Sequence, residues 1–229
     1  MSGFGGRDKG RGPLERYASF DYCYNYFQSF KDHNVIEELC NDDNIEDSCL
    51  QLSFYLASWG MYRGSAFVLQ KSSKFYEQLI KNIIEFDRRI WTIDVDNYII
   101  DNNMENIDLL IKCKEIIKES FDDWTNATDT LISKIMLGVF GNVPAFDNFF
   151  REGCRRESLQ INSFCKNSLK NIYNFYYVKE NKIKIDRHSN NIQTLDFVTG
   201  LDSNRTYTKA KIIDMIFFTE GNKKKLSIH

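Results

Sequence analysis

The residues best suited to chemistry lie in one stretch, from Thr128 to Arg156, and Asp147 is central among them. An apolar run ends at two glycines, Gly138 and Gly141. Pro144 follows, and Asp147 comes three residues later. Proline fits the first turn of a helix, so we expect a new helix here with Asp147 in its first turn. A helix start keeps a carboxylate ionised, and such a group can stabilise a developing positive charge.

Two readings of this stretch stay open on spacing alone. Most aspartates at helix starts only cap their helix, and Asp147 fits that role as well as a catalytic one. A basic cluster closes the stretch, and it suits either phosphate contacts or a solvated helix face; its members are Arg151, Arg155 and Arg156.

A second informative stretch spans residues 48–70, where aromatic and small residues alternate. Gly60 and Gly64 lie within it, and a glycine inside a helix costs about 1 kcal/mol relative to alanine. We therefore expect a helix break there, or the close approach of a backbone or ligand. Trp59, Tyr62 and Arg63 suit a stacking pocket with a charged donor, and the alternative is tight helix packing with Arg63 at the surface.

The totals describe one large globular domain. The chain has 229 residues, of which 42% are hydrophobic and 14% aromatic, enough to build a substantial core. A net charge of −2 argues against a protein that binds polyanions over its whole surface. A local basic groove is still compatible with that charge, because the local field decides binding.

The cysteines and histidines predict no metal site. No two cysteines have CxxC spacing, and the three histidines are far apart in the sequence. Scattered cysteines in a chain of this size are typical of reduced, buried thiols; they are Cys23, Cys40, Cys49, Cys113, Cys154 and Cys165. Neither a signal peptide nor a membrane-spanning apolar run is present, so we predict a soluble cytoplasmic protein with no cofactor.

Hydrophobic periodicity predicts an all-α fold, a predominantly helical single globular domain over residues 14–220. Residues 177–198 are the exception, since local alternation there predicts a short hairpin or an irregular excursion. Flexible tails are expected at residues 1–13, which are glycine-rich, and at residues 221–229, which are basic. The expected helices cover 14–40, 48–70, 72–90, 104–120, 157–176 and 206–220, the last capped by Thr208.

Three segments together resemble the helix-hairpin-helix DNA glycosylase superfamily. VPAFDNFF places Asp147 where that family has its catalytic aspartate, at the start of the helix after the hairpin. LISKIMLGVFGN resembles a degenerate helix plus hairpin, and KAKIIDMIFF, with Asp214, resembles a late helix of distant bacterial relatives. No lysine matches the Schiff-base lysine of the bifunctional members, and no cysteine cluster for an iron–sulfur centre is present.

The resemblance implies a monofunctional, metal-independent DNA glycosylase that flips a damaged or modified base out of the duplex. The degenerate hairpin departs from standard members of the family. This departure fits a non-standard substrate such as a modified base of phage DNA, and thus a role in anti-phage defence. Asp147 would be catalytic, and the base pocket would be formed by Trp59, Tyr62, Arg63 and Phe146. The DNA backbone would be bound by Lys134, Gly138, Gly141, Asn142, Arg151, Arg155 and Arg156. A helical DNA-binding module without catalysis and a helical protein-interaction module are the alternatives.

Overall fold

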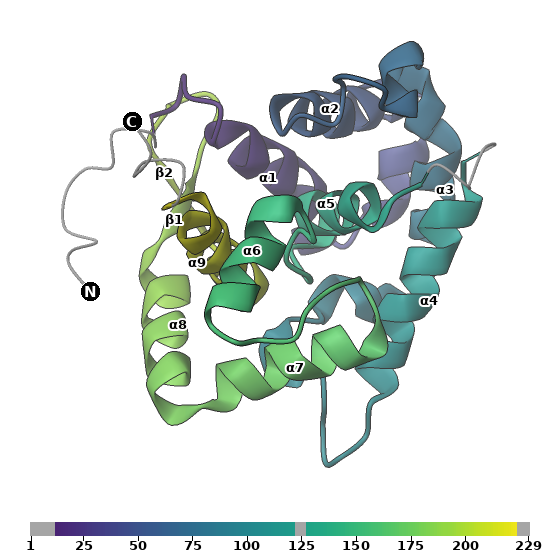
Figure 1. The fold of residues 1–229 in the computed structure, drawn as a ribbon. Coiled ribbons are helices and arrows are strands. Elements are labelled where there is room, and N and C mark those ends of the chain that lie inside the picture. Colours follow the sequence, from purple (N-terminus) through teal and green to yellow (C-terminus); the bar gives the residue numbers. More distant parts are fainter. Residues whose placement is uncertain (1–11, 122–126, 224–229) are drawn as a thin grey trace.

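The computed structural model describes residues 12–121 and 127–223, so most of both predicted tails lies outside the described residues. Figure 1 shows a predominantly helical single domain, as predicted. Its helices are α1 (Ala18–Asp32), α2 (Ile45–Ser58), α3 (Glu77–Glu85), α4 (Glu105–Glu119), α5 (Asp129–Phe140), α6 (Asn148–Arg156), α7 (Lys166–Tyr177), α8 (Lys179–Asn191) and α9 (Lys209–Asn222). Short 3-10 helices are η1 (Ile36–Cys40), η2 (Phe67–Gln70), η3 (Ser73–Tyr76), η4 (Arg88–Thr92) and η5 (Val95–Asn97).

Helix α5 lies at the centre of the molecule, in contact with α1, α2 and α4 (Figure 1). Every residue from Leu131 to Phe140 is buried, which matches a helix that is apolar on all sides. Thr128 caps its start by accepting a hydrogen bond from the Leu131 N–H. The polar residues inside α5 therefore need partners within the protein.

The prediction of a hairpin at residues 177–198 is wrong, because most of that segment forms α8. Only Ile185 and Ser189 of α8 are buried, and their spacing of four residues is that of one helix face. The alternation of lysine and isoleucine in the sequence concealed this spacing. The hairpin follows instead, where β1 (Gln193–Leu195) pairs antiparallel with β2 (Asp202–Thr206).

Three of the long helices predicted are interrupted. The segment 14–40 breaks at Asn34, which has a left-handed backbone, and the segment 48–70 breaks at Gly60, with a φ of 78°. The segment 72–90 divides into η3, α3 and η4. The predicted helix break near Gly60 is thus confirmed, whereas periodicity alone overestimated the helix lengths.

Helices α6 and α9 pack in direct backbone contact, and two glycines make this possible. A Cβ atom on Gly153 would lie 2.0 Å from the carbonyl oxygen of Phe217. A Cβ atom on Gly221 would lie 1.9 Å from the carbonyl oxygen of Phe149. Backbone atoms cannot rotate aside as a side chain does, so any larger residue at either position must separate the two helices.

We expect Gly153→Ala to lower the free energy of unfolding by about 2–3 kcal/mol, because overpacking against backbone forces the helices apart. Urea denaturation followed by circular dichroism measures this change. Gly12→Ala is the matched control, since a Cβ atom there would meet only the Glu15 side chain at 3.4 Å. Equal stability of Gly153→Ala and the wild type would contradict the close contact.

Candidate functional site

Asp147 occupies the N-cap of α6. Its Oδ1 accepts a hydrogen bond from the Phe150 N–H at 2.9 Å, and its Oδ2 lies 3.3 Å from the Lys134 ammonium. The Asp147 side chain is 13% exposed and the Lys134 side chain 6% exposed. The helix begins at Asn148, so Pro144 lies in the preceding loop and the prediction that it starts the helix is wrong. The carboxylate at the helix start is nevertheless present.

Lys134 is part of the protein interior. Its Nζ donates a hydrogen bond to the Trp59 carbonyl oxygen at 3.1 Å and lies 5.7 Å from the centre of the Trp59 ring. An ammonium with this little exposure cannot reach a DNA phosphate in this conformation. The prediction of a phosphate contact for Lys134 is therefore corrected, and its role is to pair with Asp147.

A second ion pair reaches the same place from α9. The Lys211 ammonium lies 3.1 Å from Asp214 Oδ2, and Asp214 Oδ1 accepts a hydrogen bond from the Ala145 N–H at 3.0 Å. Burial raises the pKa of the Asp214 carboxyl, the negative charge of Asp147 raises it further, and Lys211 opposes both. Residues 134, 147, 211 and 214 thus form a buried group of two lysines and two aspartates, which we call the charged cluster.

Aromatic side chains cover the charged cluster, and we call them the aromatic roof: Tyr17, Trp59 and Phe218. The Trp59 ring lies edge-on to Tyr17 at 5.5 Å and to Phe218 at 5.8 Å between centroids. The Lys211 ammonium lies 5.4 Å from the Trp59 ring centre, on which the Arg16 guanidinium also rests. The Trp59 indole N–H is buried and has no hydrogen-bond partner among the described residues.

Of the four predicted pocket residues, the structure brings only Trp59 to Asp147. Phe146 is fully buried and stacks on Phe164, so its assignment as a pocket wall is corrected. The Tyr62 hydroxyl donates to the Tyr76 hydroxyl at 3.0 Å, in a different aromatic group. Arg63 is exposed, and its guanidinium lies over Gly60 in the loop after Trp59.

The glycine turn predicted to hold a phosphate is buried. Gly138 packs against the Tyr55 ring, where a Cβ atom would come within 2.5 Å. Gly141 ends α5 in a left-handed conformation, with its N–H bonded to the Leu137 carbonyl oxygen. Asn142 is fully buried and donates from Nδ2 to the Ile90 carbonyl oxygen. These glycines terminate and pack a core helix, so the phosphate contacts predicted for Gly138, Gly141 and Asn142 are corrected.

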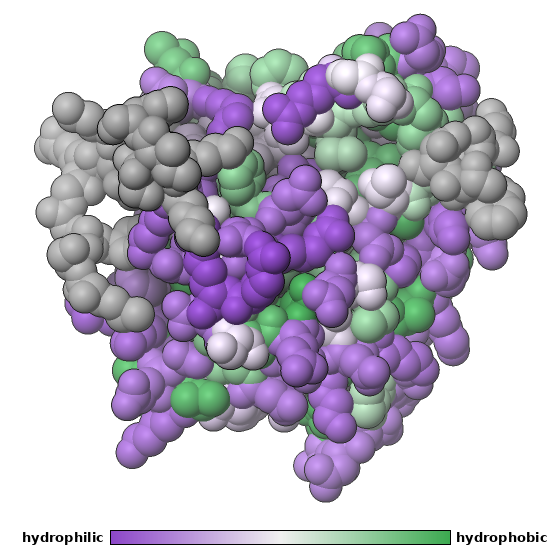
Figure 2. Space-filling view, in the orientation of Figure 1, coloured by the Kyte–Doolittle hydropathy of each residue, from purple (hydrophilic) through white to green (hydrophobic). Residues whose placement is uncertain are grey.

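The three predicted arginines lie on α6. Figure 2 shows a strongly hydrophilic patch of surface over this helix. Arg151 is partly buried and donates to the Phe146 carbonyl oxygen at 2.8 Å. Arg156 pairs with Glu152 and donates to the carbonyl oxygen of Glu220 at the end of α9. Arg155 is exposed and also pairs with Glu152. Arg151 and Arg156 thus have structural partners, while DNA contacts by the exposed Arg155 stay a prediction.

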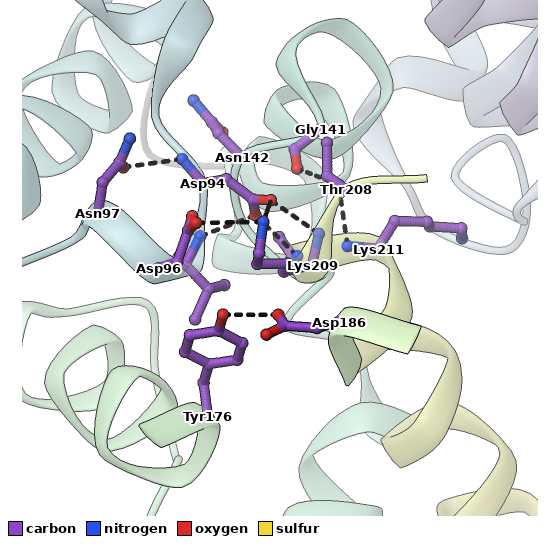
Figure 3. Close-up of polar contacts among 12 residues, drawn as sticks. Asp94, Asp96, Asn97, Gly141, Asn142, Tyr176, Asp186, Thr208, Lys209 and Lys211 are labelled. Carbon is purple, nitrogen blue, oxygen red and sulfur yellow. Dashed lines mark hydrogen bonds and ion pairs between the residues drawn. The ribbon is translucent and has the colours of Figure 1, made fainter. Parts of the chain in front are cut away.

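The first turn of α9 is anchored by Asp94, a half-buried aspartate with a side chain 18% exposed, which the sequence analysis did not single out (Figure 3). Thr208 caps α9 as predicted, and its hydroxyl also donates to the Gly141 carbonyl oxygen at 2.6 Å, which joins α9 to the end of α5. Burial raises the pKa of the Asp94 carboxyl, against the effect of its N–H donors. Asp94 accepts three backbone hydrogen bonds, at 2.7, 2.8 and 2.9 Å, from Val95, Lys209 and Ala210.

No family model, curated protein or solved structure matches this chain. Within residues 12–121 and 127–223, no helix has both the length and the apolar character needed to cross a bilayer. In the same described residues, no three histidine, cysteine, aspartate or glutamate side chains come together as a metal-binding set. The charged cluster and its aromatic roof are therefore the features of this chain that point to a function.

Proposed function

We propose that the protein is a DNA glycosylase that hydrolyses the N-glycosidic bond of a damaged or modified base, with Asp147 as the catalytic carboxylate. The observation that supports this most is the charged cluster, in which Asp147 faces Lys134 at 3.3 Å beneath aromatic rings. A carboxylate held in place by a helix start and an ammonium needs no reorganisation when a charge develops beside it.

The chemistry requires a negative charge close to C1′ of the sugar. As the bond from C1′ to the base nitrogen breaks, its electron pair leaves with the base and positive charge builds on the sugar ring. Asp147 would stabilise that charge and orient a water molecule, whose oxygen bonds to C1′. The water loses one proton and the departing base gains one. The low exposure of the cluster strengthens the electrostatic effect, because solvent screening is reduced.

The aromatic roof supplies a place for the extruded base. Trp59 and Phe218 lie in contact with each other over the cluster, so a flipped base would have to part them and stack on one or both rings. The Trp59 indole N–H, which has no partner among the described residues, would then donate to an acceptor on the base edge. This arrangement supports a base-specific pocket without identifying the base.

One observation favours the competing proposal of a non-catalytic helical module that binds DNA or another protein. Both oxygens of Asp147 already have structural partners, the Phe150 N–H and the Lys134 ammonium. A purely structural cap would look the same, since most aspartates at this position are caps. The two proposals differ in whether base release depends on the negative charge of Asp147.

The decisive experiment is an assay for abasic sites. The protein is incubated without metal with a panel of genomic DNAs that includes heavily modified phage DNA, and abasic sites are then cleaved with alkali. We expect strand breaks only after alkali, and breaks confined to phage DNA would support a role in anti-phage defence. Breaks before alkali would indicate a lyase or nuclease activity and contradict a monofunctional glycosylase, and no breaks on any DNA would favour the non-catalytic module.

A further inference from the structure

A groove with exposed aromatic walls runs along the seam between α1 and α2, away from the charged cluster. It consists of two adjoining cavities of about 450 and 760 Å³, which share Tyr22, Gln51 and Phe197. Phe54, on α2, is 66% exposed, and Phe197, in the turn between β1 and β2, is 74% exposed. Apolar side chains this exposed, close together around one groove, are typical of an interaction site.

The seam that holds the groove ends at the aromatic roof, although neither Tyr17 nor Trp59 lines either cavity. Helices α1 and α2 run antiparallel, since Tyr17 meets Trp59 at one end and the Tyr26 hydroxyl bonds to Ser48 at the other. The seam from Tyr17 to Tyr26 is nine residues of helix, or about 13 Å. At roughly 3.4 Å or more per nucleotide, that length accommodates two or three nucleotides. A strand that followed the seam beyond the groove would reach Tyr17 and Trp59 of the roof.

The chemistry of the lining fits nucleotides better than an apolar helix. Aromatic rings line the walls, and the amides of Gln51 and Asn204 lie between them. The Asn25 amide also lines the groove but is already bonded to Leu195 and Thr194. Rings with free faces stack on any base, and amides can bond to base edges, whereas a helix-binding groove is mainly aliphatic. The charges in the groove are nearly balanced, because Arg205 pairs with Asp32 at 2.8 Å. Stacking rather than phosphate attraction would therefore provide the affinity.

Phe197 is held in place by a rigid turn. Asp196 Oδ1 accepts hydrogen bonds from both the N–H and the hydroxyl of Thr199, each at 2.8 Å. Gly200 completes the turn with a φ of 67°, and the Phe197 ring lies edge-on to Tyr22 at 5.0 Å. A ring fixed in this way loses little conformational entropy on binding.

We infer that this groove binds two or three nucleotides of an unpaired DNA strand, stacked on Phe54 and Phe197, next to the base that enters the site. The direction of the strand rests on the proposed glycosylase function, but the binding itself does not. The inference implies that the protein prefers single-stranded or locally opened DNA over an intact duplex.

The test is fluorescence anisotropy with a labelled oligothymidine of roughly twelve nucleotides. We expect the double variant Phe54→Ser/Phe197→Ser to bind it at least about tenfold more weakly than the wild type, at low and at high salt, because stacking platforms and not charges are lost. The control, Val178→Ser/Ile183→Ser, removes two similarly exposed apolar side chains at α8 and should bind within about twofold of the wild type.

Equal affinity of the Phe54→Ser/Phe197→Ser variant and the wild type would overturn the inference. Equal affinity of the wild type for oligothymidine and for a matched duplex would overturn it as well. Sedimentation of the free proteins provides a third check: a dimer that the double variant abolishes would assign the groove to a second copy of the chain. This assay measures binding and not base release. Binding in the groove can therefore be confirmed even if no abasic sites form, and abasic sites can form even if the groove does not bind DNA.

Discussion

Asp147→Asn should lower the single-turnover rate of abasic-site formation by about 10²- to 10³-fold, the cost of losing a preorganised charge at the reacting centre. Asparagine has nearly the same shape, and its oxygen can still accept the hydrogen bond from the Phe150 N–H. The variant removes the negative charge and leaves the cap. A loss of activity therefore reports on electrostatics, and gel analysis of alkali-treated DNA measures it directly.

A charge-neutral companion variant keeps this result interpretable. Asp147→Asn leaves the Lys134 ammonium buried without its carboxylate, and breaking a buried pair can cost about 3–5 kcal/mol of stability. Asp147→Asn/Lys134→Met removes both charges, so we expect it to fold more stably than the single variant and to be equally inactive. Full activity of either variant would favour the non-catalytic module or another catalytic residue.

Asp87→Asn is the matched control for the loss of a capping carboxylate. Asp87 also caps a helix, η4, by accepting from the Arg89 N–H at 3.0 Å, and it also pairs with a basic side chain, that of Arg89. It lies outside the charged cluster, so its substitution should leave base release unchanged. Reduced activity in this control would show that the assay responds to helix capping in general.

The sequence predicts single elements of the site better than their assembly. The helix-start position of Asp147, the cap at Thr208 and the break near Gly60 all follow from local rules, and the structure confirms them. Asp214 was quoted from a motif alone, and its place beside Asp147 depends on how α9 packs, 67 residues along the chain. Hydrophobic periodicity indicates which face of a helix is buried. It does not indicate which other helix packs against that face.

The apolar neighbours of Lys134 in the sequence indicate that this lysine is buried, which our prediction did not take into account. It lies in the segment LISKIMLGVF, where nearly every neighbour is apolar, and the sequence analysis assigned it to phosphate contacts. A charged residue inside a helix that is apolar on all sides is rarely buried without a partner. The apolar surroundings of Lys134 therefore favour an internal counter-ion over the phosphate contact that we predicted, and the structure identifies that counter-ion as Asp147.

Removing the half-buried carboxylate of Asp94 should lower the free energy of unfolding more than removing an exposed charge does. Asp94→Ala deprives the three N–H groups of Val95, Lys209 and Ala210 of their partly buried acceptor, which we expect to cost about 3–5 kcal/mol in the free energy of unfolding. Asp94→Asn keeps one acceptor oxygen and should cost about 1–3 kcal/mol. Urea denaturation of the three proteins measures both values.

Asp96→Ala is the control for these variants, because Asp96 pairs with the same Lys209 side chain, at 3.1 Å, but its side chain is 39% exposed, against 18% for Asp94. A surface pair contributes about 1 kcal/mol or less, so this substitution should change stability little. If Asp94→Ala were no more destabilising than Asp96→Ala, the three backbone hydrogen bonds would not be what holds α9.

The pH dependence of the Asp94→Asn effect gives a further check, and its sign follows from burial. Because burial raises the pKa of the Asp94 carboxyl in the folded protein, the folded state binds more protons than the unfolded state between the ordinary carboxyl pKa and the raised one. The stability that Asp94 contributes therefore falls as pH rises through that interval. The difference in stability between wild type and Asp94→Asn should shrink from acidic pH to neutral pH.

Since α9 carries Lys211, Asp214 and Phe218, loosening its first turn should also disturb the charged cluster and the aromatic roof. We expect Asp94→Asn to slow base release at pH values where the variant is still fully folded, whereas Asp96→Ala should not. A variant that is destabilised yet fully active would show that the cluster holds its geometry without the Asp94 anchor, and that α5 and α6 alone position Asp147.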